Sequence, residues 1–210
     1  MSQIGEKVSD NREDPLKRGF DLVASITGLA ALWPFLVLVG AAIRLDSPGT
    51  ILYRGRRTGK GGVPFSMLKF RTMVEKAETL GGPSTGRNDP RVTRIGRILR
   101  KYKIDELPQL INVVRGEMSL VGPRPEVEQY TALYNDEERQ ILSVRPGITD
   151  YSSIEFSRLG EILGDENVDD TFETRVMPRK TALRLEYVRN RSFAEDLKII
   201  FRTIWRIFRP

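Results

Sequence analysis

Cysteine and histidine are both absent from this sequence of 210 residues. Without cysteine the chain has no disulfide, no thiolate metal site and no thiol nucleophile. Without histidine it has no Ser-His-Asp triad, no imidazole acid–base catalyst and none of the usual zinc sites. Any catalysis must therefore use carboxylates, lysine, arginine, hydroxyl groups, backbone amides or a metal held by oxygen ligands.

Acidic residues are outnumbered by basic ones, 28 to 34, which gives a net charge of +6. This balance favours an anionic partner, and nucleic acid, a phosphorylated substrate and acidic lipid all fit it. Apolar residues make up 40% of the chain, so a broadly disordered protein is excluded. A chain of this length can bury the core of one medium domain with appendages.

Charge is also nearly absent from Phe20 to Ile43, where Asp21 is the one charged residue. This run would form about 36 Å of helix, enough to cross a membrane. Pro34 near its middle removes a backbone hydrogen bond and predicts a kink or break. Cations before and after the run favour a cytoplasmic position for both ends. The residues leave two alternatives open, a re-entrant helix–break–helix and a kinked span.

A second apolar pattern lies at the C-terminus, between Phe193 and Phe208. Apolar residues recur there at helical spacing, and Lys198, Arg202 and Arg206 occupy other faces. The pattern is typical of a basic amphipathic helix that lies on anionic lipid headgroups. An ordinary helix packed on the domain is the alternative.

Between these segments, residues 50–70 predict a β-hairpin whose turn is rich in glycine and cations. Residues 91–103 form a basic stretch with an apolar helical stripe. Such a stretch could be a solvated helix face or an RNA-binding patch. No aromatic stacking platform or zinc module accompanies it, so we expect no nucleic-acid partner.

Asp105 and Glu106 begin a predicted helix whose first turn contains Pro108. Acidic residues at this position often only cap the helix. The functional alternative is that one carboxylate acts as a nucleophile and the other as a Mg²⁺ ligand, since a helix N-terminus also attracts phosphate. Magnesium would let an anionic carboxylate approach an anionic diphosphate.

Two rigid segments each contain one arginine. Arg124 lies between prolines in GPRP, and Arg145 begins RPGIT. A guanidinium group on a stiff segment suits a phosphate clamp, although a rigid connector with a solvated arginine fits equally well.

Several motifs taken together resemble the monotopic phosphoglycosyl transferases, bacterial enzymes that begin polysaccharide and glycoprotein assembly on undecaprenyl phosphate. They occur in order as KFRTM (69–73), RKYKIDELPQLINV (100–113), GEMSLVGPRP (116–125) and RPGIT (145–149), and DLKIIFRTI (196–204) resembles the terminal helix of the family. Several motifs in register are more specific than any one of them. The chain resembles the minimal form of the family.

The resemblance implies that Asp105 attacks the β-phosphorus of a UDP-sugar, releases UMP and then passes the phosphosugar to undecaprenyl phosphate. It implies that Glu106, with Asp105, is tied to Mg²⁺. It places the lipid phosphate near Arg100 and assigns substrate-binding cations to Lys69, Arg71, Arg124 and Arg145. A re-entrant membrane helix broken at Pro34 is also implied.

The expected fold is therefore α+β and mostly helical, with a small hairpin, a re-entrant membrane helix and amphipathic interfacial helices. We expect a tail (1–16), the re-entrant helix (17–45), a cytoplasmic catalytic domain (46–190) and an interfacial helix (191–210). The expected location is the cytoplasmic face of the bacterial inner membrane, in contact with anionic lipids. Dimerisation through the membrane face is an open alternative.

Some residues depart from the family pattern. Asp150 follows RPGIT where relatives commonly have glycine, Trp33 precedes Pro34 where many have a small polar residue, and residues 151–190 resemble the family only loosely. These departures leave the sugar undetermined. A non-catalytic membrane scaffold and a basic nucleic-acid-binding protein are the competing classes of function.

Overall fold

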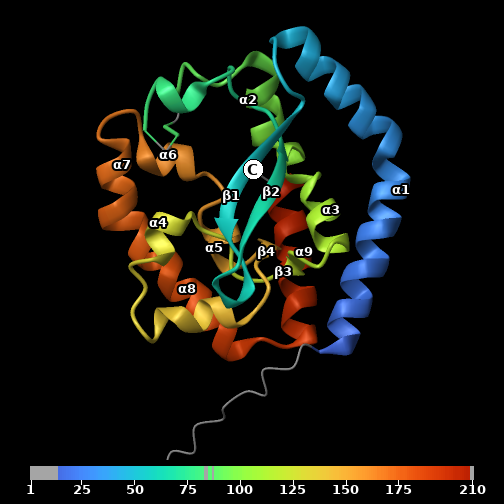
Figure 1. The fold of residues 1–210 in the computed structure, drawn as a ribbon, viewed down its shortest axis with the longest axis vertical. Helices are drawn as coiled ribbons and strands as arrows, with labels where there is room; N and C mark the ends of the chain where they lie inside the picture. Colours follow the sequence, from blue (N-terminus) through green and yellow to red (C-terminus); the bar gives the residue numbers. More distant parts are fainter. Residues whose placement is uncertain (1–13, 83–84, 87, 209–210) are drawn as a thin grey trace, which may run out of the picture.

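The computed structural model describes residues 14–82, 85–86 and 88–208. It is mostly helical, with one antiparallel hairpin and one short parallel strand pair, so the predicted α+β class is confirmed. The predicted tail of residues 1–16 lies almost entirely outside the described residues. Figure 1 shows the hairpin at the centre of the domain, with the long helix α1 along one side and the helices α4, α6, α7 and α8 on the opposite side.

The first half of the described chain contains the long helix, the hairpin and the short helices that follow them. Its elements are α1 (Pro15–Asp46), β1 (Leu52–Thr58), η1 (Lys60–Gly62), β2 (Pro64–Phe70), η2 (Ala77–Thr79), α2 (Arg94–Lys101), η3 (Ile104–Glu106), α3 (Gln109–Val114) and β3 (Ser119–Val121).

The second half is built of short helices, one further strand and two longer terminal helices. Its elements are α4 (Glu128–Thr131), η4 (Glu138–Ser143), β4 (Gly147–Thr149), α5 (Tyr151–Glu155), α6 (Leu159–Leu163), α7 (Val168–Thr171), the π-helical turn η5 (Phe172–Val176), α8 (Met177–Asn190) and α9 (Phe193–Phe208).

Helix α1 covers the predicted apolar run. It begins where the Asp14 carboxylate accepts a hydrogen bond from the Leu16 backbone amide, with Pro15 in the first turn. The helix continues without interruption through Pro34, so the predicted helix–break–helix is not seen as a break. Figure 1 shows instead that α1 changes direction along its length and curves around the domain, as a proline inside a helix favours.

Both ends of α1 contact the same domain. Near its C-terminus, Val39 and Ile43 pack with Phe70 of β2 and Leu99 of α2 in one buried cluster. Near its N-terminus, Lys17 forms an ion pair with Asp196 of α9 at 2.5 Å. Both ends are therefore fixed to one body.

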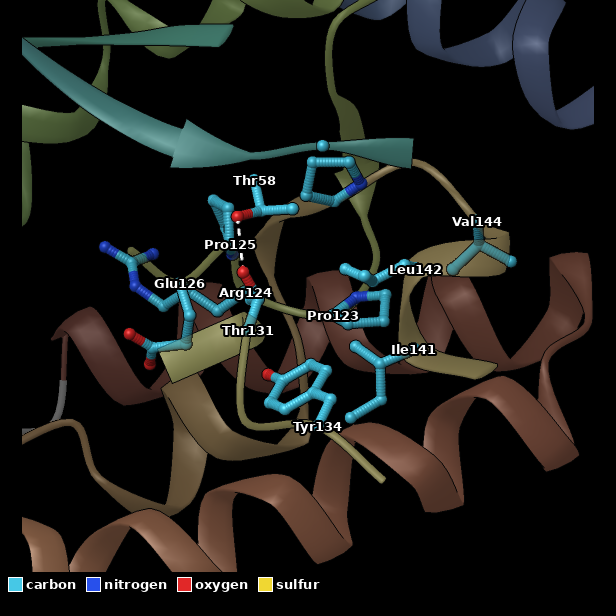
Figure 2. Close-up of a pocket in the computed structure, with 12 residues that line it drawn as sticks. Thr58, Pro123, Arg124, Pro125, Glu126, Thr131, Tyr134, Ile141, Leu142 and Val144 are labelled. Carbon is cyan, nitrogen blue, oxygen red and sulfur yellow. Dashed lines mark hydrogen bonds between the residues drawn. The ribbon is translucent and has the colours of Figure 1, made fainter. Parts of the chain in front are cut away.

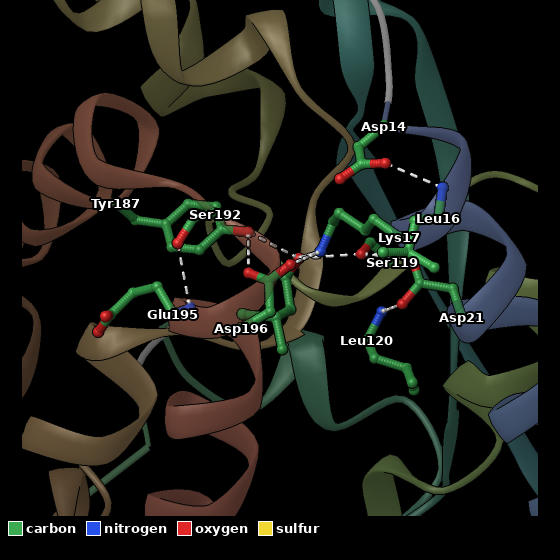
Figure 3. Close-up of polar contacts among 11 residues, drawn as sticks. Asp14, Leu16, Lys17, Asp21, Ser119, Leu120, Tyr187, Ser192, Glu195 and Asp196 are labelled. Carbon is green, nitrogen blue, oxygen red and sulfur yellow. Dashed lines mark hydrogen bonds and ion pairs between the residues drawn. The ribbon is translucent and has the colours of Figure 1, made fainter.

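The N-terminal contact belongs to a buried polar cluster, shown in Figure 3, which we call the α1–α9 joint: Lys17, Asp21, Ser119, Tyr187 and Asp196. The Lys17 ammonium also donates to the Val121 carbonyl at 2.9 Å. Ser119 Oγ donates to Asp21 at 2.7 Å, and the Tyr187 hydroxyl donates to Asp196 at 2.7 Å. The joint ties α1 to β3, α8 and α9 through long-range contacts.

The hairpin forms as predicted. Strands β1 and β2 pair antiparallel, from Leu52 opposite Phe70 to Thr58 opposite Pro64. The turn between them contains Gly61 and Gly62 with φ of 67° and 78°, a left-handed conformation that favours glycine. The glycine-rich turn therefore allowed this strand pairing to be predicted from the sequence.

The parallel pair β3–β4 brings the GPRP and RPGIT motifs together, which the sequence did not predict. Gly122 and Gly147 lie so close that a Cβ atom on Gly147 would approach the Gly122 nitrogen to 2.1 Å. The Gly122 amide donates to the Thr149 carbonyl at 3.1 Å, and the Gly147 amide donates to the Pro123 carbonyl at 3.0 Å. Only glycine allows this approach, which fixes the backbone on both sides of Arg124.

Candidate active site

Asp105 and Glu106 lie in the short 3-10 helix η3, just before α3. Lys103, the residue before η3, has a left-handed φ of 57°, which turns the chain sharply between α2 and η3. Asp105 is buried, and 7% of its surface stays exposed. The acidic pair therefore precedes a helix as predicted, but both side chains point toward the protein interior rather than into solvent.

A buried asparagine holds α3 against the hairpin. The Asn112 side chain accepts from the Leu68 backbone amide at 2.9 Å and donates to the Ser66 carbonyl at 2.8 Å. This attachment places β2 beside η3, and Lys69 Nζ donates to Glu106 Oε1 at 3.2 Å.

Arg124 holds Glu106 from the other side. Its guanidinium donates to Glu106 Oε2 through Nη1 at 3.1 Å and to Oε1 through Nη2. Nη1 also donates to the Ile148 carbonyl of β4 at 2.9 Å. The GPRP arginine is thus a clamp, and its partner in this structure is the carboxylate of Glu106.

Asp150, noted above as a departure from the family pattern, fixes the backbone of Arg124. The Asp150 carboxylate accepts from the Arg124 amide at 3.0 Å and from the Ser153 amide at 2.7 Å at the start of α5. It is fully buried. The aspartate therefore connects the clamp to α5, and it has a positioning role that its sequence context did not reveal.

The two carboxylates of the pair have opposite electrostatic environments. Burial and then repulsion by Glu106 raise the pKa of Asp105. Burial alone would raise the pKa of Glu106 too, but Arg124 and Lys69 outweigh it and lower that pKa well below its usual value. Glu106 is therefore a fixed anion within an ion-pair network, whereas Asp105 has a more basic carboxylate.

Asp105 also has an unused hydrogen-bond acceptor. Its Oδ1 atom is buried and has no hydrogen-bond partner among the described residues. Gln109 lies one helical turn further on, fully buried, and neither of its amide atoms has a partner there. Buried polar atoms without partners are costly, so they are rare outside ligand sites and strained regions.

The structure brings together four of the predicted site residues: Lys69, Asp105, Glu106 and Arg124. The charge of Arg100 favours the ionised form of Asp105, which indicates that Arg100 lies near these four residues. Its Nε donates to Thr72 Oγ1 at 2.9 Å, which orients the guanidinium group.

Arg71 and Arg145, the other two predicted substrate-binding cations, are not brought to the acidic pair. Arg71 donates to the carbonyls of Pro48 and Ser47 in the loop after α1, the latter at 2.8 Å. Arg145 donates to the Gly116 carbonyl at 2.6 Å. In this structure both guanidinium groups donate to backbone carbonyl oxygens, and these hydrogen bonds connect neighbouring segments of the chain.

A second group of buried charges, which the sequence did not predict, lies on α8. Lys180 and Arg184 are both buried, and Arg184 pairs with Glu126, which directly follows the GPRP motif. One signal was present in the sequence, since Lys180 and Arg184 are four residues apart and share one helix face. Their burial could not be predicted, because such cations normally lie on the surface.

A metal at this site would have limited protein ligands. No three acidic side chains gather as a metal site within the part of the chain that the structure describes. Mg²⁺ needs few protein ligands, since it commonly takes one or two carboxylates together with substrate phosphates and water. The unpartnered Asp105 Oδ1 fits such a ligand, with Glu106 beside it.

This arrangement defines a class of site: a buried carboxylate with a free oxygen, surrounded by cations that can hold phosphate groups. It lies in a protein whose helix α1 is long and apolar enough to cross a membrane, by length and composition alone. The chain belongs to the bacterial sugar transferase family, whose sequence model matches residues 12–210.

Individual relatives are similar along nearly the whole chain. It is 46% identical to an undecaprenyl-phosphate glucose phosphotransferase of Komagataeibacter xylinus over 197 residues, which cover 90% of this chain and 35% of that protein. It is 41% identical to a UDP-glucose:undecaprenyl-phosphate glucose-1-phosphate transferase of Caulobacter vibrioides, over 91% of this chain and 69% of the relative.

A third relative, the exopolysaccharide production protein ExoY of Rhizobium meliloti, is 38% identical over 90% of this chain and 83% of its own length. The chain thus spans about a third of the Komagataeibacter protein and most of the Rhizobium one.

Proposed function

We propose that this protein transfers a sugar-1-phosphate from a UDP-sugar to undecaprenyl phosphate and releases UMP. The relatives named for this reaction support the substrate classes. The observation that carries the proposal is Asp105: a buried carboxylate with a raised pKa and an unpartnered oxygen, beside cations suited to phosphate.

The proposed reaction has two steps. In the first, an Asp105 carboxylate oxygen attacks the β-phosphorus of the donor, and the bond from that phosphorus to the bridging oxygen breaks to release UMP. In the second, a phosphate oxygen of the lipid attacks the same phosphorus and releases the Asp105 carboxylate. The lipid then carries a diphosphate-linked sugar.

Lys69 and Arg124 have two tasks in this scheme. They hold Glu106 as a fixed anion, and their remaining donors can contact the donor's phosphate oxygens. Arg100, oriented by Thr72 near Asp105, would meet the phosphate of the lipid. Arg71 and Arg145 would act on substrate indirectly, by fixing the segments that surround the site.

Mg²⁺ would be held by Asp105 and Glu106 with the donor diphosphate. When bound, it would neutralise phosphate charge and so let the carboxylate approach. Removal of divalent ions with a chelator should therefore abolish UMP release, and added Mg²⁺ should restore it.

We also propose that α1 enters and leaves the cytoplasmic membrane face. Both of its ends pack on one domain, whereas a simple span would carry them to opposite sides. Large apolar side chains of α1 such as Val23, Trp33 and Leu38 are exposed, as are Phe201 and Trp205 of α9. These faces suit a lipid surface, with α9 lying on anionic headgroups.

The topology can be tested with accessibility labels at Gly5 and Thr50. Both labels should react with a reagent added outside intact inverted membrane vesicles, because the cytoplasmic face is the outer face of such vesicles. Labels that report opposite sides would exclude the re-entrant path and support a kinked span.

The reaction is tested by UMP release from a panel of UDP-sugars, with purified protein, Mg²⁺ and undecaprenyl phosphate in nanodiscs. Asp105→Asn should abolish release, and Asp136→Asn, a change at an exposed aspartate, should leave it unchanged. UMP release by the Asp105 variant at the normal rate would remove Asp105 from the mechanism. A scaffold would show no release with any donor.

A further inference from the structure

One face of the hairpin is turned toward the candidate active site. Tyr53 of β1 pairs with Lys69 of β2 in the antiparallel register, so the two side chains lie on the same face of the hairpin. Cβ atoms directly opposite each other in such a pair are about 5 Å apart. On this face Lys69 Nζ donates to Glu106 at 3.2 Å. Tyr53 is therefore a direct neighbour of the site, and nothing in the proposed reaction uses it so far.

Gly55 and Arg57 share this face of β1 with Tyr53, because side chains alternate along a strand. The Tyr53 ring and the Arg57 guanidinium meet over the glycine. A Cβ atom on Gly55 would lie 2.9 Å from Tyr53 Cε1 and 3.3 Å from Arg57 Nη1. Gly55 therefore leaves the space that these two side chains fill, and the Arg57 guanidinium is directed back along the strand toward the Tyr53–Lys69 pair.

The end of β1 is fixed beside the segment that contains Arg124. Thr58, the residue after Arg57, donates its backbone amide to the Glu126 carbonyl at 2.9 Å. Figure 2 shows Thr58 next to Pro125 and Glu126. The charge of Arg124 acts on Arg57, in agreement with this placement. Arg57 and Arg124 thus approach the same region from neighbouring segments.

The Arg57 guanidinium has donors that a ligand can use. Its side chain is half-buried, and Nη1 donates to the Arg56 carbonyl at 2.7 Å. Arg57 forms no ion pair within the part of the chain that the structure describes. Glu126, the carboxylate whose charge acts on it, pairs with Arg184 instead. A charged guanidinium in such a position suits a phosphate group, which it can contact through two N–H donors.

A UDP-sugar has a second phosphate beyond the one that is attacked. If the β-phosphorus lies at Asp105 beside Lys69, the α-phosphate is the next group along the donor, and it gains negative charge as UMP leaves. We propose that Arg57 binds this α-phosphate and that the Tyr53 ring positions the Arg57 guanidinium for it. The inference rests on the proposed function, because it assumes a UDP-sugar donor. The same hairpin face then presents one cation to each phosphate.

The test compares equilibrium binding of UMP and of uridine, which lacks the phosphate, to the purified protein in nanodiscs. Arg57→Met should weaken UMP binding by about 10- to 100-fold, the effect of losing charged hydrogen bonds. Uridine binding should change less than about 2-fold, because its contacts do not involve the lost charge. Arg57→Lys, which retains the charge, should recover part of the UMP affinity. Arg56→Met is the matched control, since this neighbouring arginine is exposed and pairs with Glu128, and it should bind UMP as the unchanged protein does.

Two further positions test the role of Tyr53. Tyr53→Ala should weaken UMP binding by less than Arg57→Met does, and Tyr53→Phe, which retains the ring, should restore it. Gly55→Ala adds the Cβ atom that displaces both side chains while leaving them in place, so it should also weaken UMP binding and spare uridine binding. These variants change side chains at a half-exposed edge of the hairpin, where the tyrosine has 49% of its surface exposed.

Unchanged UMP binding in Arg57→Met would overturn the assignment, and so would an equal loss of UMP and uridine binding, which would indicate a structural role. Should Arg57→Met fail to fold, Arg57→Lys and Gly55→Ala decide, because both must weaken UMP binding selectively. The readout needs no turnover. A protein that binds UMP through Arg57 but releases UMP from no donor would refute the proposed reaction alone, and one that transfers sugar with UMP binding independent of Arg57 would refute the subsite alone.

Discussion

Two buried polar clusters in this protein look alike in composition and differ in how completely they are hydrogen bonded. In the α1–α9 joint, Lys17 and Tyr187 both donate to Asp196, and Ser119 donates to Asp21 (Figure 3). In the candidate active site, Asp105 Oδ1 has no partner among the described residues. The first cluster is internally satisfied, and the second has capacity left for a ligand.

This difference indicates that the α1–α9 joint stabilises the fold, whereas the candidate active site is suited to binding a ligand. A buried polar network that is fully paired contributes to stability and to a unique structure, because breaking one bond strands the partner. A buried carboxylate without a partner instead costs stability, which a bound substrate or cation can recover. Substitutions in the two clusters should therefore have opposite consequences.

The largest expected effect concerns Asp105. Asp105→Asn should reduce transfer at least about 1,000-fold, because an amide cannot act as the nucleophile that forms the acyl phosphate with the phosphosugar. It should also raise stability by about 1 kcal/mol, because the pKa of Asp105 is raised by burial and an ionised Asp105 therefore opposes folding at neutral pH. Activity assays and thermal unfolding of the same sample measure both, and a clear loss of stability would contradict the comparison.

The next effect concerns the joint. Asp196→Asn should lower stability by about 2 kcal/mol, because the Lys17 ammonium and the Tyr187 hydroxyl lose a charged acceptor. The melting temperature should fall by roughly 4–8 °C while the activity per folded molecule is retained. Glu195→Gln, one residue away and on the more exposed side, is the matched control. Loss of activity in a folded Asp196 variant would show that the joint is part of the site.

A smaller effect is expected at Arg124. Arg124→Lys retains the charge but loses the two-pronged contact with Glu106, and activity should fall about 10- to 100-fold. Arg56→Lys, at an exposed arginine paired with Glu128, should have no effect on activity. Equal activity of the two variants would show that the orientation of the Arg124 guanidinium group is unimportant.

The smallest effect is a pH dependence of stability. The pKa of Glu126 is lower in the folded protein than its ordinary value of 4.5. The stability that the ionised Glu126 carboxylate contributes is therefore fully present above about pH 4.5 and is lost as the pH falls through the lower pKa of the folded protein. Glu126→Gln should therefore lower stability at neutral pH and flatten the acid part of the stability profile. Denaturant titrations between pH 3 and 7 measure both, and parallel profiles would show that Glu126 contributes no pH dependence.

The sequence predicted the features that depend on local pattern. The apolar run became α1, the glycine-rich turn became the hairpin, and the periodic C-terminal segment became α9. The acidic pair was also recognised, with Lys69 and Arg124 beside it, because the motifs are contiguous and resemble a known family. Local periodicity and turn chemistry contain this information.

Features that depend on long-range packing were not predicted. Strands β3 and β4 have three residues each, which is too few to show an alternation of apolar and polar residues. Their pairing, with Gly122 close to Gly147, was therefore not predicted. The burial of Lys180 and Arg184 was not predicted, because charged side chains are rarely buried and the sequence pattern around these two contains no sign of it. Arg71 and Arg145 lie in recognisable motifs, yet their partners are backbone carbonyls set by the tertiary fold.

The central claim is that Asp105 is the nucleophile, and an intact-mass measurement tests it most directly. The protein would be incubated with UDP-glucose, the donor in the name of the Caulobacter relative, and Mg²⁺ without lipid. A mass gain of one hexose phosphate, mapped to Asp105 and lost on addition of undecaprenyl phosphate, is the predicted result. Lipid-dependent transfer with no adduct at any time, in a protein that turns over this donor, would contradict the claim and indicate direct transfer between the two substrates.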